Sequence, residues 1–172
     1  IMIIVVLRNL ICLLGLFALL PLIFITIFIV YIEDGFPVIF KQKRLGLNQK
    51  QFTIYKLRTL KNKAPQLGTH EIADEYILKS GNIIRKLKLD ELPQLINVLM
   101  GDLNLIGPRP GLDTQIALRE ARIANEIFQI KPGITGLSQV LGYDMSNPEK
   151  LSYVDKIYIQ KKSMFIDILI SQ

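Results

Sequence analysis

The sequence is poor in the residues that form disulfides and thiolate metal centres. Cys12 is its only cysteine, which excludes an internal disulfide and a cysteine-based zinc site. Cys12 falls inside an apolar stretch, where we expect it to act as a small hydrophobic side chain. The single histidine, His70, stands in the polar segment 68–71 and is predicted to lie in a surface loop.

Charged residues are absent from Leu10 to Ile32, a run of 23 residues that is nearly all Leu, Ile, Val and Phe. As a helix this run would be about 35 Å long at ~1.5 Å per residue, enough to reach across the core of a bilayer. It is too long for the core of a signal peptide, and no small-residue cleavage site follows it. The run therefore predicts a retained membrane segment.

Pro21 interrupts this run near its middle. Proline removes one backbone hydrogen bond and clashes with the preceding turn, so we expect a kink there. The kinked helix could span the membrane, or the kink could turn the chain back as a re-entrant hairpin. Arg8 precedes the run, and Lys41, Lys43 and Arg44 follow it. Because both flanks are positive, charge leaves the two arrangements open.

Acidic residues are absent between Gly35 and His70, a stretch that holds eight basic residues. The rest of the chain has 13 basic and 15 acidic residues, so the whole positive excess lies in this stretch. Cations in that position favour the cytoplasmic side and anionic headgroups, although a solvated loop that only sets topology has the same composition. No recognition motif or aromatic platform accompanies the charge, which argues against nucleic acid as a partner.

The remaining pattern predicts a small domain with both strands and helices. The predicted elements are an extended piece at 36–40, a strand at 51–57, and helices at 71–88, 90–100 and 113–130. An interruption of the first helix is expected at 80–82. The helix at 113–130 has an apolar face that includes Ile116, Ile123 and Ile127. Such faces can pack in a core or lie flat on a bilayer, and the sequence leaves both open.

Two adjacent carboxylates, Asp90 and Glu91, open the predicted helix 90–100 just before Pro93. Unpaired N–H groups at a helix start keep a carboxylate ionised and can also hold a phosphate. An ionised aspartate can attack phosphorus, and a neighbouring glutamate can hold Mg²⁺. Acidic residues in a first turn are also common caps, so this spacing alone supports capping as well as catalysis.

Basic residues near this pair could contact phosphate. Arg85, Lys86 and Lys88 lie just upstream, and Arg109 stands between two prolines. A guanidinium on a rigid loop suits bidentate phosphate binding, while proline brackets also occur in structural turns.

Five motifs follow the apolar run in order. They are FTIYKLRT at 52–59, LDELPQLINVL at 89–99, GD at 101–102, GPRP at 107–110, and PGITG at 132–136 with Gln139-Val140 after it. This set resembles the bacterial sugar transferase family of monotopic phosphoglycosyl transferases, over about residues 8–168. Each motif is weak alone, and their shared order carries the resemblance.

The resemblance implies a reaction. Members of this family move a sugar 1-phosphate from a UDP-sugar to undecaprenyl phosphate and release UMP, which starts assembly of a surface or glycoprotein glycan. The aspartate of the dyad is their nucleophile and forms a covalent phosphosugar intermediate. That residue corresponds to Asp90, and Glu91 corresponds to the Mg²⁺ ligand.

The resemblance also implies a set of substrate-binding residues. Basic positions around the phosphates correspond to Lys56, Arg85 and Arg109, and Arg58 lies in the same motif as Lys56. Asp155 corresponds to a carboxylate late in the family pattern.

The implied fold is mixed α/β and mostly helical, with amphipathic helices on the membrane surface. The family's N-terminal segment is a re-entrant helix broken at a proline, which corresponds to Pro21. The expected domains are a membrane hairpin at 1–34 and a cytoplasmic catalytic domain at 35–172. The chain is expected at the cytoplasmic face of the bacterial inner membrane, among its lipids and with later glycosyltransferases as further partners.

Two departures from the family pattern stand out. Leu20 precedes Pro21 where the family often has serine, and Tyr143 follows Gly142 where the family often has arginine. The second change removes a cation from an expected uridine or phosphate contact. Two other functions remain as alternatives, a non-catalytic membrane scaffold for glycan enzymes and a hydrolase that uses the same carboxylates. The sugar and the oligomeric state are left open.

Overall fold

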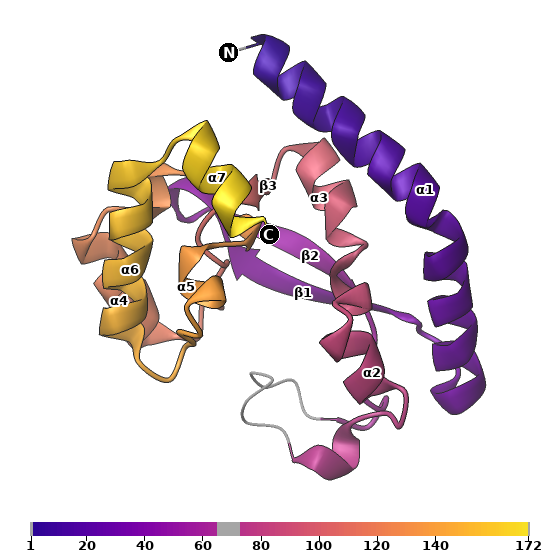
Figure 1. The fold of residues 1–172 in the computed structure, drawn as a ribbon. Helices are drawn as coiled ribbons and strands as arrows, with labels where there is room; N and C mark the ends of the chain where they lie inside the picture. Colours follow the sequence, from indigo (N-terminus) through magenta and orange to yellow (C-terminus); the bar gives the residue numbers. More distant parts are fainter. Residues whose placement is uncertain (1, 65–72, 172) are drawn as a thin grey trace. The chain divides into compact units, whose positions relative to one another are not determined.

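The computed structural model describes residues 2–64 and 73–171 of the chain. The α-helices are α1 (Met2–Asp34), α2 (Gly81–Lys86), α3 (Gln94–Met100), α4 (Ile116–Ala124), α5 (Leu137–Val140), α6 (Pro148–Lys161) and α7 (Met164–Ile170). The strands are β1 (Ile39–Leu45), β2 (Gln51–Leu57), β3 (Asn104–Ile106) and β4 (Gly133–Thr135). The short 3₁₀ turns are η1 (Leu47–Gln49), η3 (Asp74–Tyr76), η4 (Leu89–Glu91) and η5 (Ile127–Gln129). The predicted mixed, mostly helical α/β class is confirmed (Figure 1).

The chain forms two compact units. Unit 1 comprises residues 1–41 and 55–96, and unit 2 comprises residues 42–54 and 97–172. Strands β1 and β2 pair with each other and contribute residues to both units. The connection between them is only five residues long, so the pair is an antiparallel hairpin.

Helix α1 is continuous, and Pro21 lies inside it. The ribbon curves along its length in Figure 1. Two side chains weaken its hydrogen-bond ladder over one turn. Pro21 has no N–H to donate, and the Thr26 hydroxyl donates to the Leu22 carbonyl oxygen at 2.8 Å, a contact that often bends helices.

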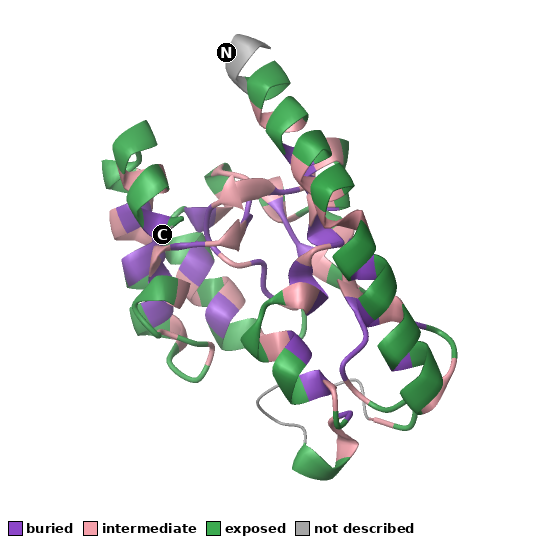
Figure 2. Ribbon diagram, turned by 45° about the vertical axis from the view of Figure 1, so that its right-hand side comes forward, coloured by how far each residue is buried: buried purple, intermediate pink, exposed green. Residues whose placement is uncertain are grey.

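By length and composition α1 is the one helix of the described residues that could cross a membrane. Large apolar side chains are exposed along it from Val5 to Ile32 (Figure 2). Water solvates such a surface poorly, whereas lipid does not penalise it. The predicted membrane-associated segment is therefore present as one long apolar helix.

Unit 1 has a small core at the C-terminal end of α1. Thr26 and Val30 recur at helical spacing and form part of the buried side of the helix. Val30 packs in one cluster with Val38, Leu78 and Ile84, which joins the end of α1 to the start of β1 and to α2. This core fixes the end of α1 against the segments that carry the candidate site.

Unit 2 is organised by the parallel pair β3 and β4, in which Asn104 is aligned with Gly133 and Ile106 with Thr135. Both glycine motifs of the sequence lie on this pair. The Gly107 amide donates to the Thr135 oxygen at 2.9 Å, and the Gly133 amide donates to the Pro108 oxygen at 3.0 Å. A methyl group at Gly133 would lie 2.1 Å from the Gly107 nitrogen, so only glycine fits.

Several predicted element boundaries differ from the structure. The helix predicted over 71–88 is confined to Gly81–Lys86. A 3₁₀ turn at Asp74–Tyr76 and an extended stretch precede it. Residues 71–72 of this segment, and His70 of the predicted loop, lie outside the described residues. The helix predicted over 113–130 is shorter, at Ile116–Ala124, and is followed by η5. The interruption expected at 80–82 corresponds to the turn that immediately precedes α2. The turn near 125 is made by backbone hydrogen bonds, which periodicity does not reveal.

The face predicted for the 113–130 segment is also wrong in part. Ile116 and Ile123 are exposed, and α4 buries Leu118 and Arg122 instead. Ile127 is buried as predicted, although it belongs to η5. An ion pair described below explains why a charged residue is on the inner side of α4.

Candidate active site

The two adjacent carboxylates lie in the 3₁₀ turn η4, which precedes α3 and is not part of it. Lys88 has a left-handed backbone with φ of 57° and reverses the chain between α2 and η4. The Glu91 amide donates to the Lys88 oxygen at 3.2 Å, which closes the turn. As a result Asp90 and Glu91 are both buried, each with a relative exposure of 9%.

Glu91 forms an ion pair with Lys56. Lys56 Nζ donates to Glu91 Oε1 at 2.8 Å, and both side chains are largely shielded from water. Lys56 is the next-to-last residue of β2, so a strand and a turn separated by more than thirty residues meet here. The structure thus brings together two of the residues predicted for the site.

Asp90 is electrostatically strained. Burial raises the pKa of its carboxyl above the usual value, because desolvation outweighs the opposing effect of Lys56. Glu91 acts in the same direction as burial, and Arg85 acts against it. Among the described residues, nothing donates a hydrogen bond to the buried oxygen Oδ1 of Asp90. One oxygen of this carboxylate is therefore buried without a hydrogen bond from the described residues.

Arg85 stands at the end of α2, beside the dyad. Its Nε donates to the Thr59 hydroxyl at 2.8 Å. Burial lowers the pKa of the guanidinium, while the nearby Asp90 raises it. Lys56 and Arg85 thus lie near the carboxylates, on β2 and α2, and the substrate-binding roles predicted for both stay predictions.

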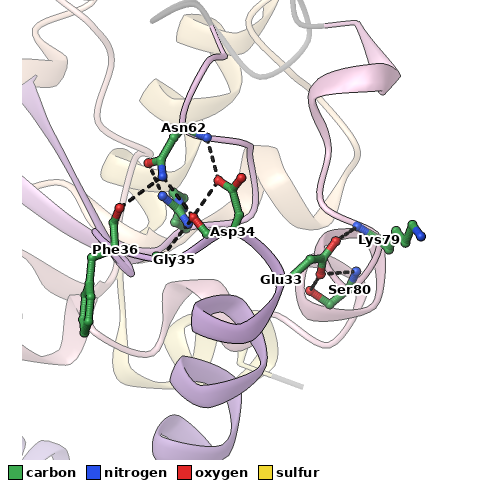
Figure 3. A network of polar contacts seen from close by, with 8 residues as sticks. Glu33, Asp34, Gly35, Phe36, Asn62, Lys79 and Ser80 are labelled. Atoms are coloured by element: carbon green, nitrogen blue, oxygen red, sulfur yellow. Dashed lines mark hydrogen bonds and ion pairs between the residues drawn. The ribbon is translucent and has the colours of Figure 1, made fainter.

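Arg58 is placed differently from these residues. Its Nη2 donates to the carbonyl oxygens of Asp34 at 2.9 Å and Gly35 at 2.8 Å, and it lies 3.2 Å from Asp34 Oδ2. Its Nη1 donates to the Asn62 side chain (Figure 3). The guanidinium is buried at the end of α1 by these contacts. The substrate-binding role predicted for Arg58 stays a prediction.

Arg109 and Asp155 belong to unit 2. Asp155 is buried, and its two oxygens accept from Arg122 Nη2 and from the Ser138 hydroxyl, each at 2.8 Å. Burial raises the pKa of Asp155, and Arg122 opposes the shift. The substrate-binding roles predicted for Arg109 and Asp155 also stay predictions.

Sequence reasoning missed the other basic residues around Asp155. Arg44 lies on β1 and donates to the Pro110 oxygen at 3.2 Å. Burial, together with the charges of Arg109 and Arg122, lowers the pKa of Arg44 to about 10. The spacing of Arg122 could have indicated its burial, because it lies four residues after the buried Leu118, on the same side of α4.

A magnesium ion is the cofactor that the resemblance implies, and the residues of unit 1 fit it. The unpartnered buried oxygen of Asp90 and the adjacent Glu91 are hard anionic ligands of the kind that Mg²⁺ selects. The described residues hold no cluster of three or more potential metal ligands. Mg²⁺ usually takes one or two protein carboxylates together with substrate phosphates, and the magnesium ion stays a prediction.

The chain matches known proteins over nearly its whole length. The family model of the bacterial sugar transferases matches residues 3–171. The uncharacterized sugar transferase EpsL of Bacillus subtilis is 42% identical over 149 residues, which are 87% of this chain and 73% of EpsL.

Two further relatives are named for a donor and an acceptor. The UDP-N-acetylgalactosamine-undecaprenyl-phosphate N-acetylgalactosaminephosphotransferase of Aeromonas hydrophila is 36% identical, over 87% of this chain and 37% of that protein. The UDP-glucose:undecaprenyl-phosphate glucose-1-phosphate transferase of Caulobacter vibrioides is 39% identical, over 71% of this chain and 47% of that protein. The chain thus spans less than half the length of these two relatives.

A family match of this extent, on a chain that places its acidic dyad among cations beside a long apolar helix, decides the class. The chain belongs to the bacterial sugar transferase family.

Proposed function

We propose that the chain transfers a sugar 1-phosphate from a UDP-sugar to undecaprenyl phosphate and releases UMP. The observation that carries the proposal is the grouping of Asp90 and Glu91 with Lys56 and Arg85 in one unit with the apolar helix α1. Family membership and the substrates named for the relatives from Aeromonas and Caulobacter support it.

In the first step Asp90 is the nucleophile. A carboxylate oxygen forms a bond to the phosphorus that carries the sugar, and the bond from this phosphorus to the bridging oxygen breaks, so UMP leaves with the bond's electron pair. The unpartnered Asp90 Oδ1 supports this role, because no protein hydrogen bond from the described residues must be broken before attack. The product is an aspartyl phosphosugar.

In the second step an oxygen of undecaprenyl phosphate attacks the same phosphorus. The bond to Asp90 breaks, the carboxylate is regenerated, and the lipid carries a diphosphate-linked sugar. UMP can leave before the lipid binds, so ping-pong kinetics are expected.

Phosphoryl transfer between anions depends mostly on positioning and charge neutralisation. Lys56 and Arg85 reduce the repulsion between Asp90 and the diphosphate, and Lys56 also holds Glu91 in place. Glu91 would hold Mg²⁺, which when bound supplies positive charge to the phosphate oxygens. Arg58, Arg109 and Asp155 complete the proposed substrate-binding set.

The proposed placement is the cytoplasmic face of the bacterial inner membrane. Residues 1–34 would form a re-entrant hairpin turned at Pro21, and residues 35–172 a catalytic domain among membrane lipids and later glycosyltransferases. The missing N–H of Pro21, the Thr26 hydroxyl bond one turn later and the positive residues on both flanks support this arrangement. Labelling of cysteines introduced at Val5 and Asp34 from one side of sealed vesicles tests it, since a spanning helix would expose only one of them.

The decisive experiment measures UMP release from a panel of UDP-sugars by the purified chain with undecaprenyl phosphate and Mg²⁺. The Asp90→Asn variant should lose activity by at least about a thousandfold, and Asp74→Asn, an exposed acid of the same unit, is the matched control. Intact-mass detection of a phosphosugar adduct on Asp90 checks the covalent step. Full activity in Asp90→Asn would contradict the mechanism, and UMP release with free sugar phosphate in place of lipid product would indicate a hydrolase.

A further inference from the structure

The end of α1 is bound to the segments around the dyad by two acidic side chains, Glu33 and Asp34 (Figure 3). These are the first charged residues after the apolar run. Contacts of Glu33 and Asp34 therefore connect the apolar helix with the rest of unit 1. The residues that these two side chains bind show which parts of the candidate site are held.

Glu33 caps α2 from a distant part of the chain. Its Oε1 accepts from the Lys79 amide, and its Oε2 accepts from the Ser80 amide at 3.1 Å and the Ser80 hydroxyl at 2.6 Å. Ser80 is the N-cap residue of α2, and its own side chain makes no capping hydrogen bond. The Glu33 carboxylate therefore supplies the anionic cap that the start of α2 needs.

The contact of Glu33 with Ser80 is connected to Asp90 through helix α2. Helix α2 begins at Gly81 and carries Arg85 about one turn further on. Arg85 is the guanidinium that acts on the pKa of Asp90 and is held by Thr59. Because η4 follows α2 directly in the chain, a shift of Glu33 relative to α2 would move Arg85 and Asp90 together relative to the end of α1.

Asp34 is connected to Glu91 through Arg58 and Lys56. Its Oδ2 accepts from the Asn62 amide at 2.7 Å and lies 3.2 Å from Arg58 Nη2, and its carbonyl oxygen accepts from Arg58 as well. Arg58 follows the end of β2 and stands two residues after Lys56, which holds Glu91 at 2.8 Å. Each acid of α1 is therefore connected to one carboxylate of the dyad.

We infer that Glu33 and Asp34 are positioning residues that hold the dyad at a fixed height above the end of the membrane helix, an inference that rests on the proposed function. The phosphate of a polyprenyl phosphate stays at the membrane surface, whereas a UDP-sugar approaches from water. Only the second transfer step needs Asp90 at a set height, so the two acids act on the acceptor step and not on UMP release.

The test uses the full chain in lipid nanodiscs, with Glu33→Gln and Asp34→Asn as variants. Glutamine keeps one acceptor oxygen of the two that Glu33 uses, and asparagine removes the charge that pairs with Arg58. The matched controls are Asp74→Asn and Glu75→Gln, exposed acids of the same unit. Acceptor-free UMP release and transfer from the phosphosugar enzyme to undecaprenyl phosphate are measured separately.

We expect UMP release and the KM for the UDP-sugar to change by less than about twofold, and lipid transfer to fall by about tenfold or more. Hydrogen exchange at the Lys79 and Ser80 amides should accelerate in Glu33→Gln. A short-chain, water-soluble polyprenyl phosphate in detergent should restore the second step, because its phosphate is not held at a fixed height.

An equal loss in both half-reactions, with no recovery on the soluble acceptor, would overturn the inference in favour of simple destabilisation. Unchanged lipid transfer in both variants would also overturn it. Failure of the proposed function is distinguishable, because the wild-type chain would then release no UMP, while the exchange rates at Lys79 and Ser80 do not depend on substrate.

Discussion

Lys56 Nζ lies 2.8 Å from Glu91 Oε1, in a pair whose side chains are 16% and 11% exposed. The pair fixes η4 to the end of β2 and keeps a cation beside Asp90 before any substrate binds. Because both charges are partly desolvated, neither is stable in this position alone. The contact therefore stabilises the fold and also takes part in the proposed chemistry.

Replacing Lys56 should lower both the stability of the fold and the catalytic activity. Lys56→Met leaves Glu91 without its cation, and we expect the free energy of unfolding to fall by about 2–3 kcal/mol and kcat/KM by about a hundredfold. Lys56→Arg should retain most of the stability. Thermal denaturation and UMP release check the two effects, and a Lys56→Met variant as stable as the wild type would contradict the importance of the pair.

Asp90→Asn should make the protein inactive and more stable at neutral pH. Burial raises the pKa of Asp90 in the folded state, so folding favours its protonated form. Its favourable contribution to stability is thus complete below the ordinary pKa of an aspartate and is lost as the pH rises through the raised value. Asparagine mimics the neutral form, and the Tm difference between variant and wild type should shrink as the pH is lowered from 7 to 4. A variant less stable than the wild type at pH 7 would argue against a strained carboxylate.

Removal of Mg²⁺ should stop UMP release. We expect EDTA to abolish activity, added Mg²⁺ to restore it, and Glu91→Gln to raise the Mg²⁺ concentration needed for half-maximal activity by about tenfold or more. Asp102→Asn, a change in the GD motif of unit 2, serves as the comparison. Equal Mg²⁺ dependence of Glu91→Gln and the wild type would rule out Glu91 as a metal ligand.

The ion pair between Arg122 and Asp155 should behave as a buried unit. Both side chains are 3% exposed, so Arg122→Met alone leaves an uncompensated carboxylate and should cost about 3–5 kcal/mol of stability. The double variant Arg122→Met with Asp155→Leu should recover part of this loss. A double-mutant cycle from denaturant unfolding measures the coupling, and additive losses would show that the two residues do not interact energetically.

Gly133→Ala should prevent the pairing of β3 with β4. The added methyl group would lie 2.1 Å from the Gly107 nitrogen, a distance that requires the two segments to separate. Gly15→Ala is the control, since a methyl group there has nothing within 4 Å. Circular dichroism and protease resistance should report a large loss for the first variant and little change for the second. Normal folding of Gly133→Ala would contradict the register.

The sequence predicted the parts of this fold that depend on local pattern. Alternation placed β2 at residues 51–57, where the structure has it, and the absence of charge located α1. Pro21 lies inside helix α1, and the re-entrant turn predicted at this residue stays a prediction. The buried side of α4 was misjudged because a buried arginine there is matched by an aspartate 33 residues away.

The candidate site was only partly predictable, because only some of its features depend on local sequence pattern. The adjacency of Asp90 and Glu91 is visible in sequence, but their burial depends on the left-handed residue Lys88 and on a cation from β2. The roles of Glu33 and Asp34 were not visible, since their partners lie between 24 and 47 residues away. Long-range hydrogen bonds of this kind leave no periodic trace.

The close approach of Gly107 and Gly133 has a consequence for exchanging parts between related enzymes. Because each backbone donates to the other and neither tolerates a side chain at the crossing, the two loops form one structural unit in spite of the helix between them. A chimera that imports 104–110 from another transferase must import 132–136 with it. The intervening segment, by contrast, can be swapped alone if Arg122, the partner of Asp155, is kept.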